Sequence, residues 1–198
     1  EEVEKLRDEY DDLAENKEYQ DHEEFVTEEN SDIVRSIFDL PKYSKTFDAL
    51  SKDPRLTTIA KQLIGEDIYL HQSRINIKPA YDGKSFPWHS DFETWHSEDG
   101  LADPKVVTGW IMLTENTAYN GPLFVIPKSH KNFVSCPGET PQDNHKQSLR
   151  YQKLGTPSLK SIKRFAKDSG GEIVGVYGKP GTVVFHECNI MHGSPDNI

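Results

Sequence analysis

The sequence predicts a mainly β domain with flanking helices, in which the strands form a sandwich or a barrel and the helices pack outside it. Apolar residues follow the helical period of 3.6 up to about residue 65, and they follow the strand period of 2 from residue 66 onward. No helical pattern alternates with the strand patterns, so a parallel α/β sheet is not expected. Helices followed by a series of short strands favour a sandwich or barrel instead.

The N-terminal region, residues 1–65, is predicted to be mostly helical. Its first helix carries one apolar face on an otherwise acidic segment, formed by Val3, Leu6, Tyr10 and Leu13. Residues 53–65 begin with an acidic N-cap followed by proline and end with glycine, which is the usual order of helix signals. Residues 31–50 are predicted to form one or two short helices.

Residues 66–198 are predicted to form the β core of the same single domain, which spans 1–198. Six segments have strand patterns and are separated by Gly, Pro and Asn turns: 67–78, 86–92, 106–114, 122–126, 173–177 and 181–186. A polar, basic insertion at 139–171 interrupts them and is expected to be partly helical. Such an insertion can be a surface excursion or a lid over the mouth of a barrel, and both interpretations stay open.

Charge and composition exclude two kinds of partner. The formal net charge is −10, but residues 1–30 hold 14 acidic and 3 basic side chains, so the remainder is near neutral. This balance lacks the basic patch of a nucleic-acid-binding protein, and the apolar runs are too short to cross a membrane. Two cysteines cannot form a disulfide scaffold, so a cytoplasmic location is expected. Because the sequence begins without Met, we expect at least one native end to lie outside it.

Three residues have the spacing of a metal site. His89 and Asp91 are two positions apart in a predicted strand, so their side chains are expected on one face. His192 follows the strand predicted at 181–186 and supplies the third ligand. Two histidines and one carboxylate that leave open positions are typical of non-haem Fe(II) oxygenases. The same ligands also suit Zn²⁺, so the spacing alone does not choose the metal.

A second signal is a strand with one polar face. Gln72, Arg74, Asn76 and Lys78 alternate with Ser73, Ile75 and Ile77, so the four polar residues share a face. This pattern fits an edge strand whose polar side lies in water. It equally fits a barrel strand whose polar side lines a cavity, where Lys78 or Arg74 could pair with the carboxylate of a small molecule.

The chain also resembles a known family. The segment from Phe86 to Gly100, which includes Phe86-Pro-Trp-His-Ser-Asp-Phe92, resembles the signature of the ectoine hydroxylases within the phytanoyl-CoA dioxygenase-like family of Fe(II)/2-oxoglutarate oxygenases. Shorter segments before and after it are similar in the same order, among them His71-Gln-Ser-Arg-Ile-Asn76, Asn120-Gly-Pro-Leu123 and Met191-His-Gly-Ser194. The resemblance implies a double-stranded β-helix core, also called a jelly-roll or cupin-like fold, with helices outside it.

The resemblance further implies roles for individual residues, and it names no catalytic residue beyond the metal ligands. These roles are iron ligands for His89, Asp91 and His192, cosubstrate ligands for Asn76, Lys78 and Ser194, and substrate ligands for Gln72 and Trp95. Gln72 and Lys78 both lie on the polar strand face, which favours the cavity interpretation. An arginine that binds the distal carboxylate of 2-oxoglutarate is expected beyond Ile198.

The implied activity is hydroxylation of the compatible solute ectoine to 5-hydroxyectoine, with Fe(II) as cofactor and 2-oxoglutarate and O₂ as cosubstrates. Succinate and CO₂ are the co-products, and the resemblance allows a homodimer. Two alternatives stay open. Residues 101–110 depart from the family pattern, which allows another small polar substrate, and a catalytically silent jelly-roll that binds metal or ligand is the third interpretation.

Overall fold

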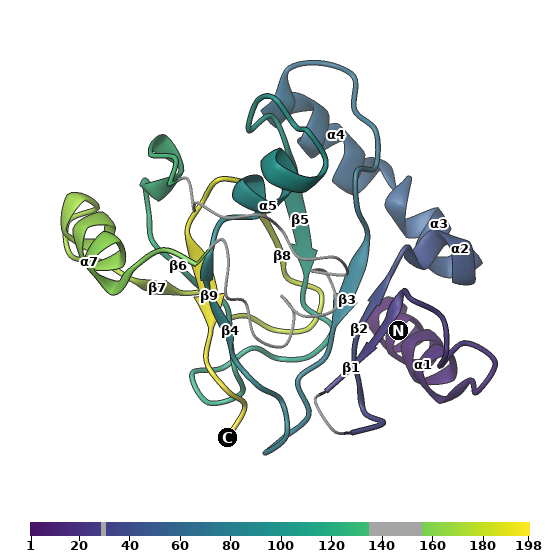
Figure 1. Ribbon diagram of the computed structural model, residues 1–198. Coiled ribbons are helices and arrows are strands. Elements are labelled where there is room, and N and C mark those ends of the chain that lie inside the picture. Colours follow the sequence, from purple (N-terminus) through teal and green to yellow (C-terminus); the bar gives the residue numbers. More distant parts are fainter. Residues whose placement is uncertain (29–30, 135–155) are drawn as a thin grey trace.

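The computed structural model describes residues 1–28, 31–134 and 156–198, and it has short strands around a barrel with helices on the outside (Figure 1). The helices are α1 (Glu2–Glu15), α2 (Leu40–Tyr43), α3 (Lys45–Ser51), α4 (Pro54–Ile64), α5 (Asp91–Glu98), the 3₁₀ helix η1 (Ser129–Lys131) and α7 (Leu159–Asp168). The strands are β1 (Phe25–Thr27), β2 (Val34–Phe38), β3 (Arg74–Asn76), β4 (Phe86–His89), β5 (Val107–Ile111), β6 (Phe124–Val125), β7 (Val174–Gly175), β8 (Val183–Glu187) and β9 (His192–Ser194). No described helix has the length and apolar character needed to span a membrane.

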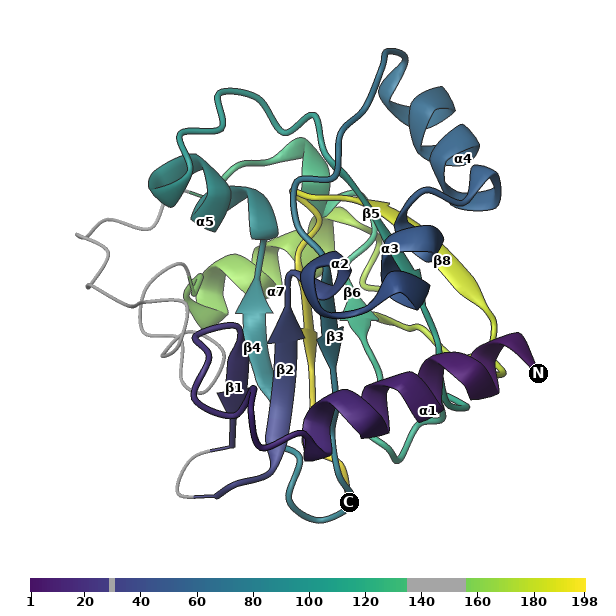
Figure 2. The same ribbon diagram turned by 90° about the vertical axis from the view of Figure 1, so that its right-hand side faces the viewer.

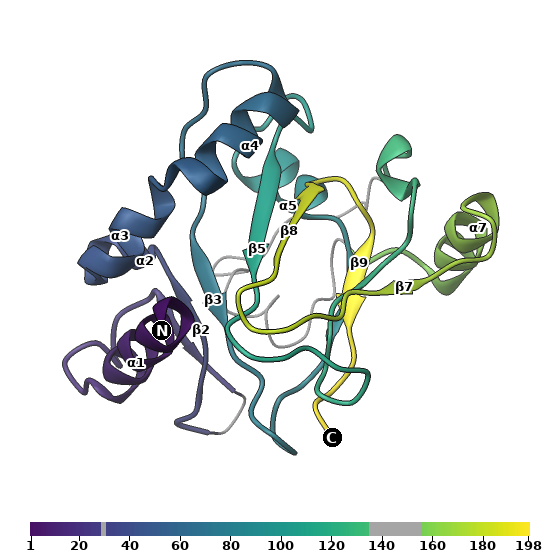
Figure 3. The same cartoon turned by 180° about the vertical axis from the view of Figure 1, so that it is seen from behind.

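The strands form three antiparallel groups. One sheet has the order β4-β9-β6-β7, a second has the order β1-β2-β3, and β5 pairs with β8. Figures 1 and 3 show the four-stranded sheet on one side of the barrel and β2 and β3 on the other, with the β5–β8 pair between them. The predicted mainly β architecture with flanking helices is therefore present.

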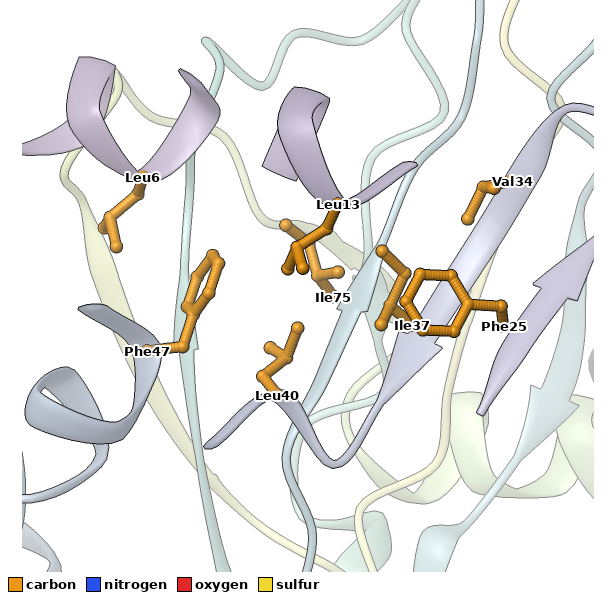
Figure 4. Close-up of a cluster of buried hydrophobic side chains, with 8 residues drawn as sticks. All are labelled: Leu6, Leu13, Phe25, Val34, Ile37, Leu40, Phe47 and Ile75. Carbon is orange, nitrogen blue, oxygen red and sulfur yellow. The ribbon is translucent and has the colours of Figure 1, made fainter. Parts of the chain in front are cut away.

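Helix α1 covers the outer face of β2 and β3, as Figure 2 shows. Leu6 and Leu13 are buried against Ile37 of β2 and Ile75 of β3, in a cluster that Figure 4 shows in close-up. The helix predicted from the spacing of Leu6 and Leu13 is thus confirmed, and so is its buried face. Because this face of β3 packs under α1, the opposite face of β3 points to the barrel interior.

The N-terminal region is less helical than predicted. Residues 31–50 contain the strand β2 before the short helices α2 and α3, and β1 precedes them. The prediction for 31–38 was wrong because four of the five residues of β2 are buried, so the strand does not alternate between polar and apolar residues. A strand buried on both faces cannot be told from a buried helix by its period.

Helix α4 begins and ends as predicted, but its apolar side is not part of the core. Asp53 caps it by accepting from the amide of Arg55 at 2.8 Å, and Gly65 ends it at a φ of 81°. None of its residues is buried, and Ile59 and Leu63 are 40% and 58% exposed. Local capping signals therefore defined the helix, whereas its apolar spacing did not predict burial.

The strands of the β core lie within or next to the predicted segments but are shorter. The segment 67–78 contributes only β3, and the segment 86–92 ends its strand at His89 because α5 begins two residues later. Strand β9 was not predicted, since His192 was expected to follow the last strand, which was predicted to end at residue 186. The insertion 139–171 is partly helical as predicted, because its described part contains α7. Residues 139–155 of the insertion lie outside the described residues.

Arg35 is a fully buried cation between the helical flank and the barrel. Its guanidinium donates to the Glu28 carboxylate at 2.8 Å and to the carbonyl oxygens of Lys84 and Ser85 at 3.1 and 3.0 Å. It also lies 3.9 Å from the centroid of the Phe86 ring, at the start of β4. The side chain thereby ties β2 to the residues that lead into β4.

We expect Arg35→Met to lower the free energy of unfolding by about 3–5 kcal/mol, because the buried carboxylate of Glu28 would lose its cation. The double variant with Glu28→Gln should recover most of this loss, since no buried charge is then left unpaired. Urea unfolding measures both effects. Arg55→Met is the control: this exposed arginine pairs with Glu2 and Asp53, and its loss should cost much less than the loss of Arg35. Equal losses for Arg35 and Arg55 would contradict this account.

Candidate metal centre

Two histidines and a carboxylate converge where β4 pairs with β9. The register places His89 opposite His192, and Asp91 follows as the first residue of α5. One carboxylate oxygen of Asp91 lies 3.6 Å from Nε2 of His89 and 3.7 Å from Nε2 of His192. One potential ligand atom from each residue lies within 4.8 Å of the others, and the described residues hold no second group of this kind.

Asp91 reaches this position from a helix and not from a strand, so the expected i, i+2 placement on one strand was wrong. Ser90 ends the strand conformation and caps α5 by accepting from the amide of Glu93 at 3.3 Å. The order Ser-x-x-Glu from Ser90 to Glu93 is the sequence signature of such a cap. That signature was the available signal for α5.

Each histidine is held by the same local contact. Nδ1 of His89 bonds to the carbonyl oxygen of Pro87 at 2.6 Å, and Nδ1 of His192 bonds to that of Ile190 at 2.9 Å. Because a carbonyl oxygen only accepts, Nδ1 carries the proton in both rings. Nε2 of a neutral ring then keeps its lone pair, which is the arrangement that a metal ligand needs.

The electrostatics of the site favour the protonation states of metal ligands. Burial lowers the pKa of His89, and burial together with His89 lowers the pKa of His192 to about 3. Burial opposes ionisation of Asp91, but His192, His89 and Arg74 outweigh it and hold the pKa of this carboxyl below its ordinary value. At neutral pH the site therefore offers two neutral imidazoles and one carboxylate, as metal binding requires.

Gly193 brings the two ligand-bearing strands unusually close together. A Cβ atom at this position would lie 3.1 Å from the carbonyl oxygen of Phe86 and 3.2 Å from the amide nitrogen of Trp88. Both atoms belong to the backbone of β4, so they could move only if the strand moved. The absence of a side chain next to His192 is therefore a condition of the observed strand pairing.

Two further basic residues lie near the centre. The ring of His186 has its centroid 5.4 Å from that of His192. The Arg74 guanidinium lies 5.6 Å from the centroid of the Phe38 ring and contributes positive charge at Asp91. Burial lowers the pKa of Arg74, which is half-buried and lies close enough to Asp91 to interact with its charge.

Ile75 and Asn76 lie on opposite faces of β3. Ile75 is buried in the core cluster under α1, while Asn76 is exposed, as is Gln72 in the segment before the strand. Asn76 also accepts a hydrogen bond from Ser36 of β2 at 2.7 Å. Asn76 thus lies on the face of β3 opposite the core cluster, and no contact between described residues joins Asn76 or Gln72 to the three clustered ligands.

Lys78 lies beside Ser194 and not beside the three ligands. Its amino group donates to Oγ of Ser194 and to the carbonyl oxygen of Pro195, both at 2.5 Å. Burial, with a smaller contribution from Arg35, lowers the pKa of Lys78 to about 8. The predicted cosubstrate residues Lys78 and Ser194 are therefore brought together by a direct hydrogen bond.

Trp95 lies on α5 and is mostly covered. It is 8% exposed and packs in a cluster with Phe92 and Cys188. The ring of His71 meets its indole edge-on, with centroids 4.9 Å apart, and Nε2 of His71 lies 3.4 Å from a carboxylate oxygen of Asp99. Trp95 thus connects α5 to the segment that precedes Gln72.

Comparison with known proteins identifies relatives over most of the chain. It is 48% identical over 176 residues to the ectoine dioxygenase of Bordetella bronchiseptica, a match that covers 89% of this chain and 56% of that protein. The crystal structure of EctD from S. alaskensis with 2-oxoglutarate and 5-hydroxyectoine superposes with a TM-score of 0.85 at 40% identity, covering 100% of this chain and 63% of that one. The crystal structure of the same protein with bound Fe has a TM-score of 0.85 at 39% identity, with coverage of 100% and 63%. The chain thus spans little more than half the length of these relatives.

These likenesses confirm the predicted double-stranded β-helix with flanking helices and the resemblance found in the sequence. The family described as Phytanoyl-CoA dioxygenase (PhyH) matches residues 1–198, which is every residue of the sequence. The three clustered ligands lie within the matched region. The chain belongs to the phytanoyl-CoA dioxygenase family.

Proposed function

We propose that the protein is an Fe(II)- and 2-oxoglutarate-dependent dioxygenase that hydroxylates ectoine to 5-hydroxyectoine. The reaction consumes ectoine, 2-oxoglutarate and O₂ and releases 5-hydroxyectoine, succinate and CO₂, so that one oxygen atom enters each organic product. The observation that carries the proposal is the convergence of His89, Asp91 and His192 in a member of this family. The relatives named ectoine dioxygenase, and the EctD structures with Fe, 2-oxoglutarate and 5-hydroxyectoine, support the choice of cofactor and substrate.

His89, Asp91 and His192 would hold the iron. Two neutral imidazoles and one carboxylate form a facial set of donors that fits Fe(II) and leaves room for other ligands. Bound Fe(II) with 2-oxoglutarate supplies the oxidation chemistry that converts a substrate C–H bond to C–OH. Zn²⁺ fits the same donors but would not support this oxidation, so turnover distinguishes the two metals.

The cosubstrate is expected to bind between β3 and β9. Asn76 and Ser194 stay predicted ligands of 2-oxoglutarate, and so does Lys78, although its amino group already donates to Ser194. Arg74, which the strand pattern also indicated, is a further candidate, because a half-buried guanidinium near Asp91 is suited to a carboxylate. In this arrangement Lys78 also orients the Ser194 hydroxyl.

The substrate is expected to lie against the polar face of β3 and the start of α5. Gln72 is exposed just before β3 and offers a donor and an acceptor. Trp95 would present the small exposed part of its indole to the delocalised cation of ectoine. Both residues stay predicted ligands of the substrate. The homodimer and the cytoplasmic location also stay predictions.

A jelly-roll that binds metal without turnover is the alternative function. It shares the three ligands, so metal binding alone does not separate the two proposals. Ectoine-dependent succinate formation does, because only an oxygenase couples cosubstrate decarboxylation to the substrate. Anaerobic addition of Fe(II) and 2-oxoglutarate, followed by air and ectoine, tests this with succinate and hydroxylated product as readouts. Succinate with another small polar compound and none with ectoine would change the substrate and keep the chemistry.

Removal of one metal ligand should abolish Fe(II) binding. We expect His192→Ala and Asp91→Ala each to weaken Fe(II) affinity by more than about 100-fold, since two remaining ligands hold the ion poorly. Anaerobic isothermal titration measures this affinity. His22→Ala, at an exposed position on the helical flank, is the matched control and should bind as the unchanged protein does. Unaltered affinity in both ligand variants would refute the assignment of the metal site.

Loss of the half-buried Arg74 guanidinium should weaken cosubstrate binding selectively. Arg74→Gln removes a charged hydrogen-bond donor worth about 1.5–3 kcal/mol, so the KM for 2-oxoglutarate should rise about 10- to 100-fold. The KM for ectoine should change little. Arg164→Gln, on the exposed face of α7, serves as control. An unchanged KM for 2-oxoglutarate in Arg74→Gln would show that a residue other than Arg74 binds the carboxylate of 2-oxoglutarate.

The lowered pKa of Lys78 predicts a dependence of stability on pH. Its pKa of about 8 in the folded protein lies below the ordinary value of 10.5, so the unfolded chain binds more protons between these two pH values. The folded state therefore gains stability as the pH rises through this window. The difference in free energy of unfolding between the unchanged protein and Lys78→Met should increase by about 1–2 kcal/mol between pH 8 and pH 10. This value includes a reduction for the partial exposure of Lys78.

Urea unfolding at several pH values measures this change. Lys163→Met, at an exposed position on α7, should follow the unchanged protein across the same range. If the difference between the unchanged protein and Lys78→Met stays constant with pH, Lys78 is not held in a destabilising environment.

A further inference from the structure

The strand pairing that joins the metal ligands is irregular next to them. Phe86 pairs with Ser194 and His89 pairs with His192, so three steps along β4 match two steps along β9. This extra residue is a β-bulge, and Pro87 within it has no amide hydrogen to donate. A short ladder that contains a bulge does not fix one register by itself. Another contact must therefore set how His89 and Asp91 lie relative to His192.

Asn189 makes such a contact from the turn that precedes β9. Its side chain is 4% exposed, and its amide oxygen accepts from the hydroxyl of Ser90 at 3.1 Å. Its amide nitrogen donates to the carbonyl oxygens of His130 at 2.8 Å and Asn132 at 3.3 Å. The side chain thus uses both ends of its amide, and this orients it.

Ser90 lies between the two metal ligands His89 and Asp91 and is itself 5% exposed. Its hydroxyl accepts from the amide of Glu93 and donates its one proton to Asn189, so both functions of the hydroxyl are used. A backbone bond from the amide of Phe92 to the carbonyl oxygen of Cys188 at 3.2 Å runs beside this contact. The two ligand segments are therefore joined on the side of the ligands that lies away from the bulge.

We propose that the hydrogen bond between Ser90 and Asn189 positions His89 and Asp91 relative to His192 and thereby sets the metal affinity of the site. Ser90 and Asn189 are positioning residues, since neither is among the clustered ligands. The bulge lets β4 turn into α5 at Ser90, and the buried bridge removes the freedom that the bulge introduces. This inference rests on the proposed function, because it concerns the same metal.

Co(II) alone is a suitable probe, because it takes the same ligands as Fe(II), binds more tightly and shows visible d–d bands that report its geometry. Ser90→Ala and Asn189→Ala should each weaken Co(II) affinity about tenfold and alter these bands, as outer contacts of metal ligands do. The double variant should bind about as weakly as either single variant, because both substitutions remove the same contact. Ser90→Thr keeps the hydroxyl and should restore affinity and spectrum.

The matched control is Ser44→Ala, which removes another buried N-cap serine, at the start of α3 in the helical flank. It should lower the free energy of unfolding by about 1 kcal/mol, as loss of a cap does, and leave the Co(II) affinity and spectrum unchanged. A cap with a purely structural role at Ser90 would behave in the same way. Unchanged Co(II) binding in Ser90→Ala would therefore overturn the inference.

Two other results would also overturn it. If the fold-losses of Co(II) affinity in the two single variants multiply in the double variant, Ser90 and Asn189 act separately and not through their shared hydrogen bond. If the unchanged protein binds no Co(II), the metal centre of the proposed function fails, and the inference fails with it. Should Asn189→Ala not fold, as circular dichroism would show, Ser90→Ala against Ser90→Thr still decides, because the two variants differ in the presence of the hydroxyl.

Discussion

The antiparallel pairing of β4 with β9 is the constraint on which the rest of the molecule depends. It brings together histidines from distant parts of the sequence, His89 and His192, and it closes one side of the barrel. β6 pairs with the other edge of β9, and α7 packs on Met191 and Ile126 beside this sheet. On the opposite side, α1 buries the outer face of β2 and β3 and leaves their inner faces for polar residues.

Much of the fold could be predicted where local chemistry determines the backbone. The caps of α4 at Asp53 and Gly65, and the apolar spacing of α1, are properties of neighbouring residues, and they located both helices. Strand β2 escaped prediction because its environment is set by distant segments, which bury nearly all of it. The exposure of the apolar side of α4 could not be predicted for the same reason, since no local pattern indicates whether another segment covers an apolar face.

The three ligands could be identified from the sequence, but their geometry could not. The spacing of His89 and Asp91 was interpreted as one strand, whereas Ser90 turns the chain from β4 into α5 between them. The bridge from Ser90 to Asn189 joins residues far apart in the sequence, so no spacing rule reveals it. Lys78 was indicated by the strand pattern and by the resemblance, and only the structure shows that its amino group already donates to Ser194.

The close approach at Gly193 has a consequence for how this sequence can drift over evolutionary time. Exchange of glycine for alanine is chemically mild, and at an exposed loop it would pass without effect. At position 193 the new methyl group would press on the backbone of β4, three residues or fewer from His89. Such a change would alter the distance between ligands without touching any of them. We therefore expect the glycine to be inherited together with the histidine that precedes it, as a single unit of selection.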